Sequence, residues 1–194
     1  MRYLTFVFFV CSLFFFSHSA FAKDDKYIAA LNNNLAFKEA MSYVTHVENR
    51  NIEVGAEAID KDGMKRLFGN NTGKYIPFNI AVTNNSKFRI YINQISIKQG
   101  NDGVLPFVDL HEVLEAIDPG GRGNKDDMRD AALRNNLINK ALPHTVLSPG
   151  ETIQGVVFVR AKSYNKSTQL FLQIQNLKRI AYLDFAVDLD GGKS

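Results

Sequence analysis

Apolar and polar residues alternate most clearly along Ile76–Ile97. Apolar side chains recur at every second position from Phe78 to Val82, and again from Phe88 to Ile92 after a turn-like Asn-Asn-Ser-Lys segment. A period of two places one set of side chains on one face of a strand, and β-branched and aromatic residues suit that pleated surface. The stretch therefore predicts two consecutive antiparallel strands at the centre of a β-sheet protein.

The alternation changes phase after Ile92. Ile95 and Ile97 fall on odd positions, whereas the apolar residues before them fall on even positions. One extra residue near Asn93 and Gln94 would account for the shift. This pattern predicts either a β-bulge or a strand that crosses between two sheets.

Similar patterns predict further strands on both sides of this stretch. They lie at Asn51–Ile59, Val104–Val108, Thr152–Ala161, Gln169–Gln175 and Ile180–Leu189. Alternating strands indicate antiparallel sheets with one face towards water. About seven short strands separated by turn signals favour an immunoglobulin-like antiparallel β-sandwich, with an N-terminal helix and a helical insert.

Helical patterns occupy Lys26–Val44, Asp109–Ile117 and Asp126–Leu142. In the first, Phe37, Met41 and Val44 follow an i, i+4, i+7 spacing, which predicts an apolar stripe that docks on the sheet. Three consecutive asparagines at 32–34 leave two shorter pieces or a loose arm as alternatives. Asp60–Gly69 is predicted to be a short turn or helix.

The helix predicted at Asp126–Leu142 has two apolar arcs, whereas a helix lying on a single sheet needs only one. One arc holds Met128, Ala131, Ala132, Ile138 and Leu142, and the other holds Leu133, Leu137 and Ala141. The second arc is either covered by the N-terminal helix or left for a partner. In the latter case the partner-binding residues are Leu133, Leu137, Ala141, Arg129 and Arg134.

The N-terminus has the three parts of a secretory signal peptide. Arg2 is followed by an apolar run, Tyr3–Phe16, and then by Ala20-Phe21-Ala22, a small-residue cleavage site. The run is shorter than the roughly 20 residues of a membrane-spanning helix. We therefore predict a signal peptide at 1–22, a helical arm at 23–50, a sandwich at 51–190 with its insert at 109–142, and a disordered tail at 191–194.

The cysteine content and the net charge narrow the class of protein further. The single cysteine, Cys11, lies inside the predicted signal peptide, so the mature chain is expected to lack disulfides, thiol catalysis and cysteine metal sites. This favours the bacterial periplasm, or secretion, over a disulfide-rich extracellular domain. The net charge of +3 comes from interspersed charges and does not suggest a nucleic-acid partner.

Two separated segments together resemble a known group. The segments are Gly69 with Tyr75–Ser86, and Leu147–Phe158. The first contains an apolar strand and an Asn-x-Ser turn, and the second contains Leu-x-Pro-Gly-Glu followed by Gly-x-x-Phe. Over roughly residues 69–160 the chain resembles bacterial secreted proteins and envelope lipoproteins with an immunoglobulin-like domain. The resemblance implies a sandwich and an envelope location, and no catalytic residue. The chain departs from the group in its long insert and in lacking a lipobox cysteine.

The best catalytic candidate is His111-Glu112-Val113-Leu114-Glu115. A zinc protease motif needs a second histidine where Glu115 stands, because two imidazoles one helical turn apart hold the metal. No Gly-x-Ser-x-Gly elbow or phosphate-binding glycine loop is present, so no cofactor is expected. Two hypotheses follow: a non-enzymatic envelope module that binds a protein partner through its helical insert, or a metal-dependent hydrolase that uses His111, Glu112 and Glu115.

Overall fold

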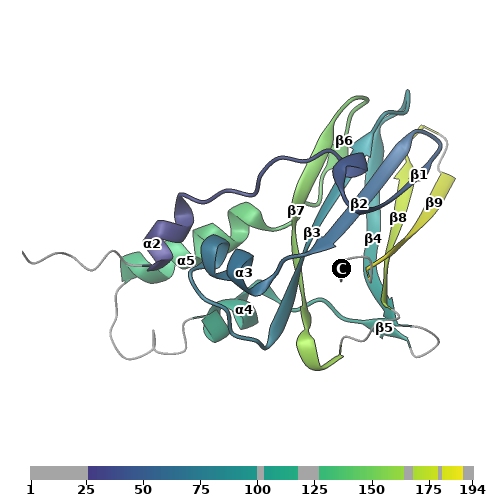
Figure 1. Cartoon of the computed structure of the whole chain (residues 1–194). Coiled ribbons are helices and arrows are strands. Elements are labelled where there is room, and N and C mark those ends of the chain that lie inside the picture. Colours follow the sequence, from purple (N-terminus) through teal and green to yellow (C-terminus); the bar gives the residue numbers. More distant parts are fainter. Residues whose placement is uncertain (1–25, 100–102, 118–126, 164–167, 179–180, 190–194) are drawn as a thin grey trace, which may run out of the picture.

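The computed structural model describes residues 26–99, 103–117, 127–163, 168–178 and 181–189 (Figure 1). Its α-helices are α2 (Lys26–Leu31), α3 (Lys61–Phe68), α4 (Leu110–Ile117) and α5 (Asp127–Lys140), and its 3₁₀ turns are η1 (Ala40–Ser42) and η2 (Ala161–Ser163). Its strands are β1 (Thr45–Asn49), β2 (Ile52–Ala58), β3 (Tyr75–Asn84), β4 (Ile90–Gln99), β5 (Val104–Leu105), β6 (Val146–Leu147), β7 (Thr152–Arg160), β8 (Thr168–Asn176) and β9 (Ala181–Asp188). The predicted signal peptide, the loop before α5 and the tail lie outside the described residues.

The protein is mainly β, with two antiparallel sheets and helices on one side (Figure 1). Sheet A has the strand order β1-β2-β3-β7, and sheet B has the order β5-β4-β8-β9, with β6 also paired to β4. Both sheets contribute to one hydrophobic core, which includes Phe78 and Ile80 from sheet A and Ile92, Leu172 and Phe185 from sheet B. Burial of this shared core holds the two sheets face to face.

The central stretch forms the two predicted strands, but they belong to different sheets. β3 pairs with β2 and β7, whereas β4 pairs with β5, β6 and β8. The register of β4 against β8 shifts between Ile92 and Gln94, which confirms the predicted β-bulge. The bulge keeps Ile95 and Ile97 on the inner face after the change of phase.

The buried side chain of Asn84 fixes the crossing from β3 to β4. Its Nδ2 donates to the carbonyl oxygens of Phe88, at 2.8 Å, and Leu147, at 3.2 Å. Its Oδ1 accepts from the backbone N–H and the hydroxyl of Ser86, and its carbonyl accepts from the N–H of Gly150 at 2.6 Å. The two segments that carry the sequence resemblance therefore meet here, and their side chains hold turns in place.

A second hydrophobic core lies between the helices and the outer face of sheet A, the face turned away from sheet B. It joins Leu67 and Phe68 of α3, Val113 of α4, Leu137 of α5 and Phe158 of β7. Figure 1 shows all four helices on this side of the molecule. No helix among the described residues is both long and apolar enough to cross a membrane.

The helical insert also covers the free edge of β7. Val108 donates its N–H to the carbonyl of Phe158, and Leu142 donates to that of Val156. Gly155 makes this approach possible, because a Cβ there would lie 2.3 Å from the Cα of Leu142. Covering an edge strand in this way removes a template for unwanted strand pairing.

Three sequence predictions need correction. Only Lys26–Leu31 of the segment predicted as helix is α-helical; residues 32–44 are extended apart from η1, in agreement with the alternative of shorter pieces. Strands β1 and β6 were not predicted, because Thr45–Asn49 is mostly polar and Val146–Leu147 is too short to alternate. The strand predicted at Val104–Val108 is reduced to Val104–Leu105 at the edge of sheet B.

Candidate functional site

The predicted partner-binding residues of α5 are mainly inside the molecule. Leu133 and Leu137 are each 2% exposed and pack in the second core, so the prediction that they contact a partner is corrected. They pack in the second core with residues of α3, α4 and β7, and α2 also contacts α5. Ala141 is half-buried at the end of the helix, Arg134 is exposed, and the side chain of Arg129 lies outside the described residues.

The N-terminal helix contacts α5 through a buried polar pair. The ammonium group of Lys140 is close to Asn136 Oδ1 and donates to the carbonyl of Ala30 in α2 at 3.3 Å. Asn136 in turn donates to the carbonyl of Leu67 in α3 at 2.8 Å. Burial lowers the pKa of Lys140. These contacts join three helices, so they hold the helical layer together.

The candidate hydrolase residues on α4 do not converge on a common point. The pair His111–Glu115 is 3.5 Å apart and mostly exposed, whereas Glu112 accepts from Tyr75 Oη at 2.9 Å and from Arg160 at 2.9 and 3.0 Å. The hydrogen bonds from Tyr75 and Arg160 lower the pKa of the Glu112 carboxyl. No group of three or more metal-ligating side chains occurs in the part of the chain that the structure describes. Glu112 therefore serves to tie α4 to β3 and β7.

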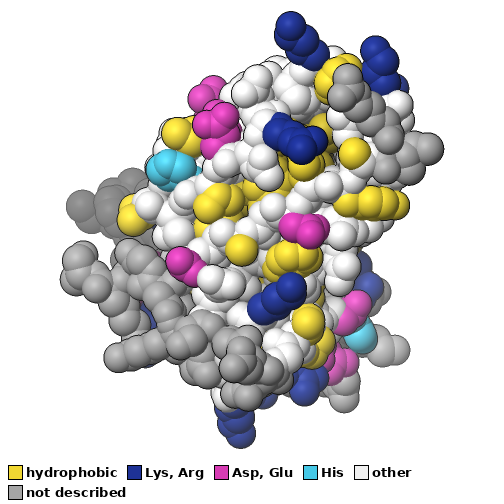
Figure 2. Space-filling model, turned by 90° about the vertical axis from the view of Figure 1, so that its right-hand side faces the viewer, with side chains coloured by type: hydrophobic (Ala, Val, Ile, Leu, Met, Phe, Trp, Pro, Cys, Tyr) yellow, Lys and Arg dark blue, Asp and Glu magenta, His cyan; other side chains and the backbone are white. Residues whose placement is uncertain are grey.

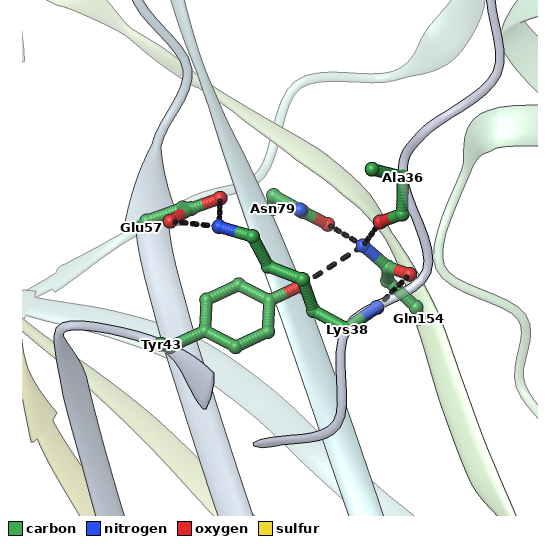
Figure 3. Close-up of polar contacts among 6 residues, drawn as sticks. All are labelled: Ala36, Lys38, Tyr43, Glu57, Asn79 and Gln154. Carbon is green, nitrogen blue, oxygen red and sulfur yellow. Dashed lines mark hydrogen bonds and ion pairs between the residues drawn. The ribbon is translucent and has the colours of Figure 1, made fainter. Parts of the chain in front are cut away.

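An N-terminal strap, residues 32–44, lies across the outer face of sheet A. Gln154 of β7 accepts from the N–H of Lys38 at 3.3 Å and donates to the carbonyl of Ala36 at 3.0 Å. Figure 3 shows the same amide pointing towards Tyr43 and Asn79, to which it donates at 3.0 and 3.3 Å. The side chain of Gln154 thus forms hydrogen bonds with one backbone N–H and one backbone carbonyl of the strap, as a neighbouring strand otherwise would.

An ion pair and a close backbone contact also hold the strap against β2. Lys38 Nζ lies 2.9 Å from Glu57 of β2 and 5.1 Å from the ring centre of Tyr43. A Cβ at Gly55 would lie 2.3 Å from the carbonyl oxygen of Ala40, so η1 rests directly on this glycine. Burial, and secondarily the charge of Glu57, raises the pKa of Tyr43.

The apolar stripe predicted for this segment faces the wrong way. Phe37, Met41 and Val44 are 69%, 46% and 79% exposed. The prediction that they dock on the sheet is wrong, because an extended strap does not bring positions i, i+4 and i+7 onto one face. Tyr43 and Ala40 make the contact with the sheet instead.

The outer face of sheet B, the face turned away from sheet A, carries no described helix (Figure 1). Cross-strand rows build this face: Tyr91–Gln175–Tyr182, Gln94–Gln173–Asp184, Ser96–Phe171–Ala186 and Lys98–Gln169–Asp188. Figure 2 shows hydrophobic side chains spread across it with single basic and acidic groups between them. Tyr182 is 52% exposed, which places an aromatic ring at the surface.

Hydrogen bonds along the rows order the polar side chains of this face. Asn93 donates to Gln173 at 2.8 Å, Gln173 donates to Asp184 at 3.1 Å, and Gln169 donates to Asp188 at 2.7 Å. Lys98 Nζ lies 3.6 Å from the ring centre of Phe171. The face is therefore an ordered array of amides and carboxylates with aromatic rings between them, and aromatic rings are enriched where proteins bind partners.

The hydroxyl of Ser96 adds an unusual feature to the same face. Ser96 is 4% exposed, and among the described residues its oxygen is the only buried side-chain N or O atom without a hydrogen-bond partner. Buried polar atoms normally have a partner.

Sequence alternation placed these side chains outward but gave no reason to single them out. Gln169, Phe171, Gln173 and Asp184 all fall in the outward phase of the strands predicted at Gln169–Gln175 and Ile180–Leu189. The available signal was Phe171 and Tyr182, aromatic residues at positions in the polar phase. Aromatic residues are enriched at protein interfaces, so these two positions favour a contact surface.

Comparisons with known proteins give no further guide to the site. The chain matches no family model, and no curated protein sequence matches it.

Proposed function

We propose that the mature chain is an exported, non-enzymatic binding module that contacts a protein partner of the bacterial envelope through the outer face of sheet B. One observation carries the proposal. The helices and the strap cover the outer face of sheet A, whereas the outer face of sheet B, with Tyr91, Phe171 and Tyr182, has no described helix on it. A rigid, hydrogen-bonded face loses little freedom on binding, which favours affinity.

The strand order supports an immunoglobulin-like assignment for the scaffold. In that fold, strands A, B and E are neighbours in one sheet and C, F and G in the other. Here β2-β3-β7 and β4-β8-β9 follow this order, with the chain crossing between sheets from β3 to β4. The helical insert takes the place in the chain where strand D would stand, and it covers the edge of β7.

Export is proposed from the sequence of residues 1–22 alone, whose apolar run and Ala-x-Ala site suit a cleaved signal peptide. The strap offers an alternative contact, because Phe37, Met41 and Val44 are exposed. We favour sheet B because its side chains are fixed by cross-strand hydrogen bonds, whereas the strap has little regular structure beyond η1.

A site-specific cross-linking experiment tests the proposal. A photo-reactive amino acid replaces Ala186 on sheet B, or Met41 on the strap, or Ile138, which is 56% exposed on α5. Each protein is irradiated in an extract of the envelope and secreted fraction of its source cells. We expect a discrete adduct from position 186 only, and we expect excess wild-type protein to suppress it.

Competition with substituted proteins provides the control. Y182K should fail to suppress the adduct, because it removes an aromatic ring from the contact face, whereas I138K should suppress it as well as wild type does. Both variants should unfold at nearly the wild-type temperature, since substitutions at exposed sites change stability by about 0.5 kcal/mol or less. An adduct formed equally from positions 41 or 138 would contradict the proposal.

A further inference from the structure

A cavity opens at the end of the two sheets where three turns meet. It has a volume of about 260 Å³ and lies among the β1–β2, β3–β4 and β8–β9 turns. Its apolar lining comes from Ile52, Phe88, Ala181 and Leu183. This volume is smaller than the ~300–1,000 Å³ of pockets for drug-sized ligands, so it suits a single apolar side chain.

Basic side chains surround the same end of the molecule. Arg50 and Lys87 line the cavity, Arg89 belongs to the same turn as Lys87, and Lys178 Nζ lies 5.3 Å from the ring centre of Phe88. All four are exposed, and none forms an ion pair with an acidic side chain of the described residues. Figure 2 shows basic side chains projecting at the upper end of the molecule. These four basic side chains therefore have no direct carboxylate partner in the described part of the chain, and Glu53, which accepts from Asn85 Nδ2 at 2.9 Å, also lies at this end.

The turn that carries Arg50 is held in an unfavourable conformation. Asn49 pairs with Ile52, so Arg50 and Asn51 form a two-residue hairpin turn, with φ angles of 53° and 62°. Such turns prefer asparagine or glycine, because the left-handed region is costly for residues with long side chains. Strained residues of this kind are concentrated at binding sites.

Backbone hydrogen bonds tie the β3–β4 turn to the β1–β2 turn and to Leu177, a described residue of the β8–β9 turn. Asn85 donates its N–H to the carbonyl of Asn51 at 2.8 Å, and Leu177 donates to the carbonyl of Arg89 at 3.2 Å. Lys178 donates its N–H to Asn176 Oδ1 at 2.9 Å. These bonds link the described backbone around the cavity, which favours a preformed site.

We infer that this end binds an acidic peptide segment, with one apolar side chain in the cavity and carboxylates against Arg50, Lys87, Arg89 and Lys178. The side-chain amide of Asn51, which also lines the cavity, provides hydrogen bonds for the peptide backbone. The cavity is too small for a lipid acyl chain. The site is separate from the outer face of sheet B and stands whether or not that face binds a partner.

Fluorescence anisotropy with matched peptides tests this inference. The probe is a labelled pentapeptide with one phenylalanine between two acidic pairs. The amide analogue, with asparagine and glutamine in place of the acids, tests the charge, and the alanine analogue tests the apolar anchor. We expect the amide analogue to bind at least tenfold more weakly, and the alanine analogue roughly tenfold or more weakly. Binding of the acidic peptide should fall at high salt.

Substitutions in the protein separate this site from general charge effects. K87Q and K178Q should each weaken binding about 2- to 5-fold, as expected for exposed ion pairs. K61Q removes an equally exposed charge on α3 and should leave binding unchanged. A substitution at Ala186 should also leave it unchanged, which distinguishes this site from the face of sheet B.

The variant R50N provides the sharpest test. Asparagine tolerates the left-handed conformation, so the unfolding temperature should rise, while loss of the guanidinium should weaken peptide binding about 2- to 5-fold. A rise in stability together with a loss of affinity cannot arise from misfolding. Equal binding of the acidic and amide peptides, or unchanged affinity in R50N, would overturn the inference. So would binding of phosphatidylglycerol vesicles that the acidic peptide does not compete for, because it would point to a membrane surface instead.

Discussion

The outer faces of the two sheets are built from similar residues but have different neighbours. Gln154 on sheet A and Gln173 on sheet B are both outward-facing glutamines on strands. Gln154 bonds to the strap, which comes from a distant part of the chain, whereas Gln173 bonds to Asn93 and Asp184 on adjacent strands. The same type of side chain therefore holds a covering layer in place on one face and orders, on the other, a surface that no described helix covers.

This difference shows which features of a strand decide whether its outer face is covered. Sheet A has small residues, Gly55 and Ala81, under η1 and apolar residues, Val156 and Phe158, under the helices. Sheet B has amides or carboxylates at six of the twelve outward positions in its four cross-strand rows. Covering layers are stabilised by apolar burial and close approach, so a polar face with large side chains remains open to solvent or to a partner.

The largest expected difference in the free energy of unfolding is between substitutions at two adjacent residues of α5. L137A should lower the free energy of unfolding by about 2–5 kcal/mol, because it leaves a cavity in the second core. I138A, at a 56% exposed position one residue later, should change it by about 0.5 kcal/mol or less. Urea unfolding followed by circular dichroism measures both. Similar losses in the two variants would show that the helical layer does not pack on sheet A as described.

A clash under the strap should give the next largest effect. G55A places a Cβ against the carbonyl of Ala40, so we expect a loss of about 1–3 kcal/mol as the strap is displaced. A186V adds bulk to an exposed position on sheet B and should be nearly neutral. Thermal unfolding compares the two. A neutral G55A would mean that η1 does not rest on sheet A.

Substitutions of Gln154 and Gln173 should give a smaller difference in the free energy of unfolding. Q154A removes the side chain that bonds to Ala36 and Lys38, and should cost about 0.5–1.5 kcal/mol. Q173A removes hydrogen bonds that are exposed to water and should cost less. Hydrogen exchange adds a local measurement, because the amide of Lys38 should exchange faster in Q154A but not in Q173A. Equal exchange in both variants would remove Gln154 as the anchor of the strap.

The smallest effect is a dependence on alkaline pH. The pKa of Tyr43 is raised in the folded protein, so above the ordinary tyrosine value of 10.0 the unfolded chain loses a proton that the folded chain retains. Stability from this group is complete below pH 10 and falls as the pH rises, by at most about 1.4 kcal/mol per unit. Y43F should lose less stability than wild type between pH 10 and 11.5. Parallel curves would contradict the burial of this hydroxyl.

The alternation of apolar residues was sufficient to predict the larger strands and the bulge near Asn93. Helical patterns in the sequence were sufficient to predict α4 and α5. It could not predict the path of the strap, because the contacts of Gln154 with Ala36 and Lys38 join residues more than a hundred positions apart. The sequence predicted two apolar arcs on α5. It could not predict whether Leu133 and Leu137 face a partner or a second core, because that depends on where α3 and α4 pack. The cavity at the turns depends in the same way on long-range assembly.

Hydroxyl-radical footprinting of the wild-type protein tests the difference between the two faces most directly. Tyr43, the strap residue that packs on sheet A, is 2% exposed, and Tyr182, on sheet B, is 52% exposed, so one experiment measures both faces with the same type of side chain. We expect Tyr182 to be oxidised rapidly in the folded protein and Tyr43 to be protected until the protein unfolds. Oxidation of both tyrosines at similar rates under native conditions would contradict the account of one covered and one open face.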